Sequence, residues 1–408
     1  MERSETLLGK YGEEGDRLIF RVLDNGDFMK GVDTSLPSSK IASSISKRAM
    51  RYDLTVPFAR FVAQHRNDLV FPFKRYQIQP VWRADRPQKG RYQEFYQCDA
   101  DVIGSESLLH EVEFVQIFDE VFAHLGFTSF QVHLNNRKIL AGLAEAAGYG
   151  DGLGELAIAL DKLDKIGPDR VVAEWMERGM PSQAVEVLAP ILHEESKRSL
   201  EHIRGLIGGT EIGSIGLEEM DDILAQLDSL GLERADVVFD ITLARGLDYY
   251  TGTIFEVTTD QMAIGSLAGG GRYDDLTATF GLKDMTGVGI SFGADRIYDV
   301  IEHLGLWPDN LSDAPKVLFV NFGKEEARYA QQWLKSLREA GIACELYPLQ
   351  SKMKKQMKYA DDRGIAYVAM AGSREMEQEV VSLKEMSSGN QQEYGLEALL
   401  GLLGIKNP

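Results

Sequence analysis

A hairpin with a strongly basic loop is the feature that most constrains the fold of this chain. Residues 74–82 are predicted to form its first strand, and residues 83–91 form a loop that carries most of its positive charge beside a proline and a glycine. In the returning strand Gln97, Asp99 and Asp101 recur at a spacing of two, so their side chains share one face of the sheet. Such a hairpin can hold a polyphosphate at its mouth and a small cationic substrate on its floor. The alternative is a solvated hairpin with a charged tip, the usual role of an isolated run of charges.

Length and composition are typical of a globular protein with more than one domain. The 408 residues predict two or three domains, and with 44% hydrophobic residues no apolar run is long enough to cross a bilayer. The N-terminus is charged and has no apolar signal core, so secretion is not expected. Cys98 and Cys344 lie far apart, which favours a cytoplasmic protein and argues against a disulfide framework or a cysteine-based zinc site.

The overall charge argues against general coating of nucleic acid. The chain has 44 basic and 63 acidic residues, a net charge of −19, whereas non-specific binding to a phosphate backbone depends on lysine and arginine. The excess acid lies in residues 1–315, and residues 316–408 are nearly neutral. This balance permits a local contact between the C-terminal part and a polyanion without requiring one.

One antiparallel sheet is predicted for the body of the chain, which comprises residues 1–139 and 235–309. Its strands follow one another through short turns with few crossovers. A helix is expected to begin at Glu106 with Ser105 as its cap and to stop at Gly126. The strands expected beyond the hairpin are residues 127–135, 237–241, 253–258 and 287–293, the middle two joined around a short turn and the last followed by a helix at 295–304.

Two further segments differ from this strand-rich body. Residues 140–234 are rich in alanine, leucine, glutamate and lysine with glycine breaks, and they predict an inserted helical domain. After a linker at residues 310–315, residues 316–408 alternate strand and helix, which predicts an α/β domain with a parallel sheet covered by helices. The expected fold class is therefore α+β: an antiparallel core with a helical insertion, plus a C-terminal α/β domain.

Two short segments could serve a substrate amine and a phosphate. Asp53 and Thr55 alternate, so a carboxylate and a hydroxyl on one face could receive an ammonium group. For this segment alone, a helix that starts near Pro57 with Thr55 as its cap is the favoured alternative. Arg83 ends the first strand of the hairpin, and its planar guanidinium suits bidentate binding of a phosphate.

Glycine-containing segments complete the set of candidates. In residues 245–250 a strand ends in an arginine that could neutralise charge on a reacting phosphorus centre, although a tight turn with two packed tyrosines is the alternative. Residues 268–275 begin with a loop of successive glycines that would let a planar ligand approach the backbone. In residues 287–296 a strand runs into a helix, where Arg296 lies in the first turn beside free N–H groups and suits a terminal phosphate.

Together these blocks resemble class II aminoacyl-tRNA synthetases. The hairpin that ends in Arg83 is similar to motif 2, and residues 287–296 are similar to motif 3. Residues 245–250 and 268–273 resemble two signatures specific to the histidyl-tRNA synthetase family, and the resemblance extends over residues 1–408. It implies activation of histidine by ATP to histidyl-adenylate and pyrophosphate. Transfer of histidine to the 3′ end of histidine tRNA would follow.

The resemblance also implies roles for individual residues. The histidine-binding residues would be Asp53, Thr55 and Gln97 at the ammonium group and Asp101 and Tyr250 at the ring, with Tyr249 as a further member. The ATP-binding residues would be Arg83, Asp85, Arg91, Gly271, Arg272, Gly293 and Arg296. The catalytic set would be Arg83 at the α-phosphate, Arg296 at the γ-phosphate and Arg245 at the α-phosphorus. Mg²⁺ would bridge the outer phosphates of ATP, and the sequence identifies no protein ligands for it.

Two departures from the family pattern lead to further expectations. Family members start with a segment containing motif 1, which builds the dimer interface, and this chain begins where that segment should end. We therefore expect an internal start or a shortened chain, and a homodimer when the segment is present. Asp53, Asp85 and Asp101 stand where many bacterial members have glutamate, which is typical of the eukaryote-like branch of the family.

A catalytically silent paralogue that binds histidine or tRNA and regulates a partner is the alternative function. Such paralogues tend to lose the phosphate-binding arginines or the C-terminal domain, and this chain keeps both. A synthetase for another amino acid is disfavoured by residues 245–250 and Asp101, which match the pattern that reads an imidazole. A lysine-rich helix expected at residues 352–362 fits a contact with the anticodon arm and a solvated helix face equally well.

Overall fold

The computed structural model describes residues 1–193, 199–244, 249–308 and 314–404. They form two compact units, Met1–Leu306 and Trp307–Pro408. Within the described ranges, no helix is both long and apolar enough to cross a membrane.

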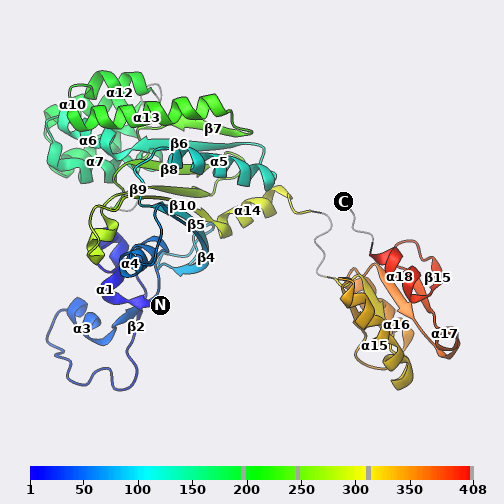
Figure 1. Ribbon diagram of the computed structural model, residues 1–408. Helices are drawn as coiled ribbons and strands as arrows, with labels where there is room; N and C mark the ends of the chain where they lie inside the picture. Colours follow the sequence, from blue (N-terminus) through cyan, green and yellow to red (C-terminus); the bar gives the residue numbers. More distant parts are fainter. Residues whose placement is uncertain (194–198, 245–248, 309–313, 405–408) are drawn as a thin grey trace. The chain divides into compact units, whose positions relative to one another are not determined.

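A seven-stranded sheet forms the centre of the first unit (Figure 1). Its strands lie in the order β4-β5-β10-β9-β8-β6-β7, and each neighbouring pair is antiparallel except β6 and β7. The strands are β4 (Phe73–Trp82), β5 (Glu94–Ile103), β6 (Phe130–Asn136), β7 (Ala235–Phe239), β8 (Thr253–Thr258), β9 (Ala268–Tyr273) and β10 (Gly287–Gly293). The predicted antiparallel core and its basic hairpin β4–β5 are confirmed.

Two predictions about the strands are wrong. β7 and β8 do not form a hairpin, because β6 lies between them and pairs with both. β6 and β7 run parallel, and a parallel pair needs a long crossover, which the helices between them provide. The glycine-rich segment at residues 268–271 is not an open loop but part of β9, whose backbone pairs with β8 and β10.

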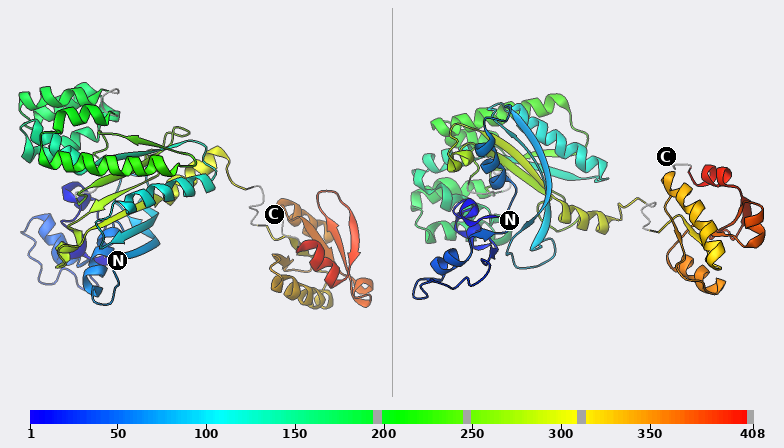
Figure 2. Two further views of the ribbon diagram at one scale, coloured as in Figure 1. Left: turned by 45° about the horizontal axis from the view of Figure 1, so that its top comes forward. Right: turned by 60° about the horizontal axis from the view of Figure 1, so that its bottom comes forward.

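Helices α5 (Leu109–His124) and α14 (Ala294–Leu304) cover one face of the sheet, as Figures 1 and 2 show. Aromatic side chains fill this interface: the ring of Phe118 on α5 meets that of Phe292 on β10 at a centroid distance of 5.3 Å. The alternation of β5 follows from this packing, since Val102 faces this core and the neighbouring acids face away from it.

The start of α5 differs from the prediction. The helix begins at Leu109 rather than Glu106, and Ser105 does not cap it. The Ser105 hydroxyl instead accepts a hydrogen bond from the backbone N–H of Ser107 and contacts the ring of His110. These local bonds hold the residues before the helix in a turn, which delays the first helical residue.

The opposite face of the sheet carries α4 (Thr55–His65) and the N-terminal residues. Val56 and Phe58 of α4 share a buried cluster with Ile103 of β5 and Tyr273 of β9. A small antiparallel sheet, β1-β3-β2, adjoins this cluster. The remaining N-terminal elements are β1 (Glu2–Arg3), α1 (Ser4–Leu7), α2 (Gly12–Arg17), β2 (Arg21–Val22), α3 (Ser38–Ile45) and β3 (Arg48–Ala49).

The predicted helical segment is a layer of helices whose buried side chains continue the core of the sheet. Gly142 and Gly213 lie where α6 and α13 cross, and a Cβ on Gly142 would be 2.6 Å from Gly213 Cα, so this approach requires glycine. The helices are α6 (Arg137–Ala146), α7 (Leu153–Leu160), α8 (Leu163–Ile166), α9 (Pro168–Glu177), α10 (Ser182–Leu188), α12 (Leu200–Ile207) and α13 (Glu211–Leu230).

The second unit has a five-stranded sheet in the order β12-β11-β13-β14-β15. The first three strands are parallel, as predicted, whereas β14 and β15 add an antiparallel hairpin that the sequence did not reveal. α15 and α18 pack on one face and α16 on the other. The elements are β11 (Val317–Phe319), α15 (Lys324–Glu339), β12 (Cys344–Leu346), α16 (Met353–Asp362), β13 (Tyr367–Met370), α17 (Ser373–Glu377), β14 (Val381–Glu385), β15 (Gln391–Tyr394) and α18 (Leu396–Leu403).

Candidate active site

A row of acidic and amide side chains lies on the face of β5 that is turned away from α5. Gln97, Asp99 and Asp101 share this face and are 8%, 2% and 2% exposed. Directly across from Asp101 the next two strands have no side chain, because Asp101 pairs with Gly289 of β10, which pairs in turn with Gly271 of β9. A Cβ on Gly289 would lie 2.1 Å from Asp101 Oδ1, so the glycine makes room for the carboxylate. The glycines therefore form a flat part of the sheet surface, which we call the floor, and the acidic row borders it.

Three oxygens of this row have no hydrogen-bond donor among the described residues: Gln97 Oε1, Asp99 Oδ1 and Asp101 Oδ2. Arg75 of β4 lies between the two acids, with Nη2 2.8 Å from Asp101 Oδ2 and 3.8 Å from Asp99 Oδ2. The shorter contact is an ion pair whose angles do not meet those of a hydrogen bond. Buried polar atoms normally have partners, so these oxygens indicate a ligand that donates hydrogen bonds.

Burial raises the pKa of each carboxyl group on this floor. The pKa of Asp99 rises to about 7, because of desolvation first and the charge of Asp101 second, while Arg75 opposes the shift. The pKa of Asp101 is raised by desolvation against the opposing effects of Arg75 and a tyrosine hydroxyl. Because the two acids interact, they titrate as a pair that retains a proton near neutral pH.

Asp53 faces the same region from the segment that precedes α4. Its carboxylate accepts hydrogen bonds from the hydroxyls of Tyr11 (2.8 Å) and Tyr249 (3.1 Å) and from the backbone N–H of Val56 (3.2 Å). The expectation that Thr55 caps α4 is wrong, since Thr55 is the first helical residue and Asp53 binds the free N–H of the first turn. Desolvation nevertheless raises the pKa of Asp53.

Three tyrosines form a wall beside the acidic row. The rings of Tyr249 and Tyr250 lie 5.0 Å apart, and those of Tyr249 and Tyr273 lie 6.1 Å apart, in edge-to-face geometry. Tyr273 donates a hydrogen bond to Asp101 Oδ1 at 2.8 Å. Burial raises the pKa of all three tyrosines, so they remain neutral hydroxyls. The ring of Tyr250 lies against Gly271, where a Cβ would be 2.8 Å from Cδ1.

Arg83 follows β4 and is held by aromatic rings. Its guanidinium stacks over Tyr52 at 4.3 Å and lies 5.1 Å from the centre of the Phe95 ring. Its Nε donates to the backbone oxygen of Tyr52 at 3.0 Å. A planar cation fixed in this way is ready to bind an anion with its two terminal nitrogens.

Arg296 lies in the first turn of α14 and joins two loops. Its Nε donates to the backbone oxygen of Gly90 at 2.6 Å, and its Nη1 donates to that of Ser266 at 2.7 Å. In the basic loop, Arg91 and Asp85 form an ion pair of 3.3 Å at the surface. The backbone N–H of Gly293, at the end of β10, donates to Leu267.

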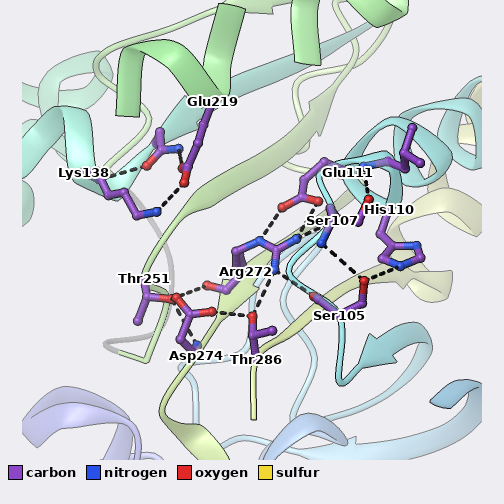
Figure 3. A network of polar contacts seen from close by, with 12 residues as sticks. Ser105, Ser107, His110, Glu111, Lys138, Glu219, Thr251, Arg272, Asp274 and Thr286 are labelled. Carbon is purple, nitrogen blue, oxygen red and sulfur yellow. Dashed lines mark hydrogen bonds and ion pairs between the residues drawn. The ribbon is translucent and has the colours of Figure 1, made fainter. Parts of the chain in front are cut away.

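Arg272 does not contact this floor, and its expected role in ATP binding is wrong. It alternates with Gly271 along β9 and therefore points to the opposite face, where it forms a buried ion pair with Glu111 (Figure 3). Its Nη atoms donate to the backbone oxygens of Ser105 and Ser107 and to the hydroxyl of Thr286. With all three guanidinium nitrogens bound internally, Arg272 is a structural residue.

Arg245 lies outside the described residues, as do residues 246–248. Of the other predicted residues, Asp53, Gln97, Asp101, Tyr249 and Tyr250 lie around one floor, and Thr55 lies beside Tyr249. Asp85, Arg91, Gly293 and Arg296 make the separate contacts described above. The sequence prediction did not include Arg75, Asp99, Tyr11 or Tyr273. Asp99 lies two residues from both Gln97 and Asp101, so the alternation of the strand indicated that it shares their face. The same alternation on β4 and β9 could have identified Arg75 and Tyr273. No local pattern singles out Tyr11, which reaches Asp53 from 42 residues away.

Comparisons with known proteins show the family of this chain. A model of the family described as histidyl-tRNA synthetase matches residues 37–297, and one described as anticodon binding domain matches residues 316–404. A histidine–tRNA ligase from Christiangramia forsetii is 53% identical and aligns with 98% of this chain and 90% of its own length. The ligase from Phocaeicola vulgatus is 50% identical, with 99% and 90% covered.

Solved structures show the same fold. The crystal structure of histidyl-tRNA synthetase from Nostoc sp. PCC 7120 has a TM-score of 0.77 and 29% identity, and covers 98% of this chain and 89% of that one. An ATP phosphoribosyltransferase regulatory subunit/histidyl-tRNA synthetase from Bacillus halodurans C has a TM-score of 0.68 at 22% identity, over 88% and 84% of the two chains, so the likeness concerns the fold alone. With a family model over more than half of its length and relatives at about half identity, the chain belongs to the histidyl-tRNA synthetase family.

Proposed function

We propose that this chain is a histidine–tRNA ligase that forms histidyl-adenylate from histidine and ATP and then transfers histidine to the 3′ end of histidine tRNA. The observation that carries the proposal is the row Gln97, Asp99 and Asp101, in which three buried oxygens have no hydrogen-bond donor among the described residues. An amino acid with an ammonium group and a ring N–H supplies such donors. The relatives at 50% identity or more are named as ligases, which favours an enzyme over a silent regulatory paralogue.

Histidine would lie along the floor with its two polar ends at different residues. Asp53, Thr55 and Gln97 would bind the ammonium group, and Asp101 and Tyr250 would bind the ring, with Tyr249 holding Asp53 in place. An amino acid that lacks the ring N–H would leave the buried Asp101 without its partner, which disfavours its binding.

ATP would lie at the mouth of the hairpin. Arg83 would bind the α-phosphate and Arg296 the γ-phosphate, with Arg91 assisting. Arg296 would exchange its hydrogen bonds with backbone oxygens for hydrogen bonds with phosphate oxygens. Asp85, Gly271 and Gly293 are the remaining candidate ATP contacts, and Gly271 would act by seating Tyr250. The carboxylate of histidine then displaces pyrophosphate in line, so positioning and charge stabilisation carry the rate, and Arg245 would stabilise the α-phosphorus.

Mg²⁺ would reach this site mainly through the phosphates of ATP. The described part of the chain contains no group of three or more His, Cys, Asp or Glu side chains arranged to hold a metal ion. Magnesium commonly binds substrate phosphates together with one or two carboxylates and water, so such a group is not required. The ion would supply charge neutralisation on the outer phosphates.

The other parts of the chain would recognise tRNA. Residues 316–408 would bind the anticodon arm, and residues 140–234 would contact the acceptor stem as a helical insertion between the two core segments, 1–139 and 235–309. Residues 310–315 would link the core to the anticodon-binding part. We further infer a cytoplasmic location, in keeping with Cys98 and Cys344 as free thiols. We also infer a homodimer when the segment containing motif 1 is present.

Exchange of labelled pyrophosphate into ATP, with and without histidine, tests the first step. Histidine-dependent exchange is expected, and Arg245→Ala should abolish it while the circular dichroism spectrum is unchanged. Near-normal exchange in that variant would remove the role of Arg245. Histidine binding without any exchange by the unchanged protein would favour the regulatory paralogue instead.

A further inference from the structure

When both of its carboxylates are ionised, the acidic row carries one more negative charge than the described residues around it balance. Among the described residues, Asp99 and Asp101 face a single guanidinium, that of Arg75, at 3.8 Å and 2.8 Å. Both carboxylates are 2% exposed, so water screens neither of them. Asp99 Oδ1 has no hydrogen-bond partner among the described residues, so it can accept a hydrogen bond from a ligand.

The other groups that face Asp99 do not supply the missing positive charge. From β10, Ser291 lies opposite Asp99 in the strand register and presents only a neutral hydroxyl, which accepts a hydrogen bond from Gln97 Nε2 at 2.9 Å. From the segment before α4, Asp53 adds negative potential. Tyr250 and Tyr273 complete the floor, and both are neutral because burial raises the pKa of their hydroxyls. Within the described part of the chain no further side chain balances the pair, and a cation in the ligand would do so.

We propose that Asp99 makes this site select histidine whose imidazole ring is protonated. The proposal rests on the proposed function, since it requires the ring to lie at Asp101. Asp53 balances the ammonium group, so the charge left over by Asp99, Asp101 and Arg75 is available for the ring. A neutral ring of the same shape would leave that buried charge unbalanced, which is unfavourable.

The proton in this scheme has a defined source. The two carboxylates of the free protein share a proton near neutral pH, and a bound imidazolium takes the place of that proton. The imidazole of free histidine has a pKa of about 6.5. At pH 8 Asp99, whose pKa is about 7, and the free ring have both largely lost their protons, so binding takes up about one proton from the solvent.

Titration calorimetry in buffers of different ionisation enthalpy measures this uptake on the whole chain. At pH 8 we expect uptake close to one proton for histidine. We expect almost none for 1,2,4-triazolylalanine, a ligand of the same shape whose ring stays neutral. The α-amines of both ligands contribute similarly. Asp99→Asn should abolish the difference in proton uptake between the two ligands, because Arg75 then neutralises Asp101. It should also reduce the ratio of the affinities for histidine and triazolylalanine by about tenfold or more.

The matched control is Glu113→Gln on α5. It removes an exposed carboxylate that pairs at 2.8 Å with Lys74, a residue of β4 that alternates with Arg75. This control should leave unchanged both the proton uptake and the preference for histidine over triazolylalanine. Asp99→Glu should likewise keep the uptake and the preference of the unchanged protein. Equal uptake with the two ligands on the unchanged protein would overturn the proposal, and this comparison needs no variant to fold. Wild-type uptake in Asp99→Asn would overturn it as well. Absence of histidine-dependent exchange would instead overturn the proposed function.

Discussion

Arg272 Nε donates to Glu111 Oε1 at 2.6 Å, and this buried pair ties β9 of the catalytic sheet to the first turn of α5. A second bond joins Arg272 Nη2 to Glu111 Oε2 at 2.8 Å. Arg272 also bonds to Thr286, whose hydroxyl donates to Asp274, and Asp274 in turn accepts from Thr251 next to the tyrosine wall (Figure 3). The network therefore supports the site from behind the sheet.

Glu111→Ala should lower the free energy of unfolding by about 3–5 kcal/mol, because the arginine would remain buried without its partner. Urea unfolding followed by circular dichroism measures the change. Glu177→Ala, which breaks the exposed pair with Arg170, is the control and should cost less than about 1 kcal/mol. Equal effects of the two variants would contradict a structural role for the buried pair.

Arg83→Lys should lose most of the activity in pyrophosphate exchange, by a factor of about 100 or more in kcat. A lysine keeps the charge but has neither the planar fork nor the stacking on Tyr52 and Phe95. Steady-state kinetics with varied ATP measures the effect. Activity in Arg83→Lys close to that of the unchanged protein would show that a point charge is sufficient at this position.

Gly289→Ala should raise the KM for histidine by about tenfold or more, because the added methyl would lie 2.1 Å from Asp101 Oδ1 and displace the carboxylate from the floor. The matched control is Gly205→Ala in α12, where nothing lies within 4 Å of the added atom. The control should bind histidine normally and should be as stable as the unchanged protein or more so. An unaffected KM in Gly289→Ala would place the ring away from Asp101.

Asp99→Asn should stabilise the folded protein at pH 8 by on the order of 2 kcal/mol, since it removes a buried charge. Burial raises the folded-state pKa of Asp99 to about 7, above its unfolded value, so the folded state binds more protons between about pH 4 and pH 7. Stability of the unchanged protein is therefore reduced as pH rises through this window. Thermal melts of both proteins at pH 5 and pH 8 measure this effect. The difference in melting temperature between Asp99→Asn and the unchanged protein should be smaller at pH 5.

Charge reversal on α16 tests the contact with tRNA. Lys354→Glu with Lys355→Glu should weaken tRNA binding and reduce the steepness of its salt dependence, because fewer phosphate contacts release fewer counterions. Filter binding at several salt concentrations measures both quantities. Lys335→Glu on α15, whose side chain pairs with Glu339 at 3.9 Å, is the control. If the double variant keeps the tRNA affinity and the salt dependence of the unchanged protein, then α16 presents a solvated face and does not contact tRNA.

Local patterns were enough to predict much of this protein. The hairpin β4–β5, the shared face of Gln97, Asp99 and Asp101, and the strand-to-helix transition at Gly293 follow from spacing and from breaker residues. These features depend on the backbone period of neighbouring residues, which the sequence displays directly. Function followed from the family resemblance of the same blocks.

Tertiary structure decided which distant groups meet. Tyr249 bonds to Asp53 across 196 residues, and Arg272 points away from the site only because β9 lies between β8 and β10 with that face toward α5. The excess charge at Asp99 likewise depends on Arg75 being placed by strand pairing at β4. The sequence by itself determined the elements and the chemistry they carry. Strand order and packing decided the partners, because a contact between remote segments depends on the whole sheet and not on any local period.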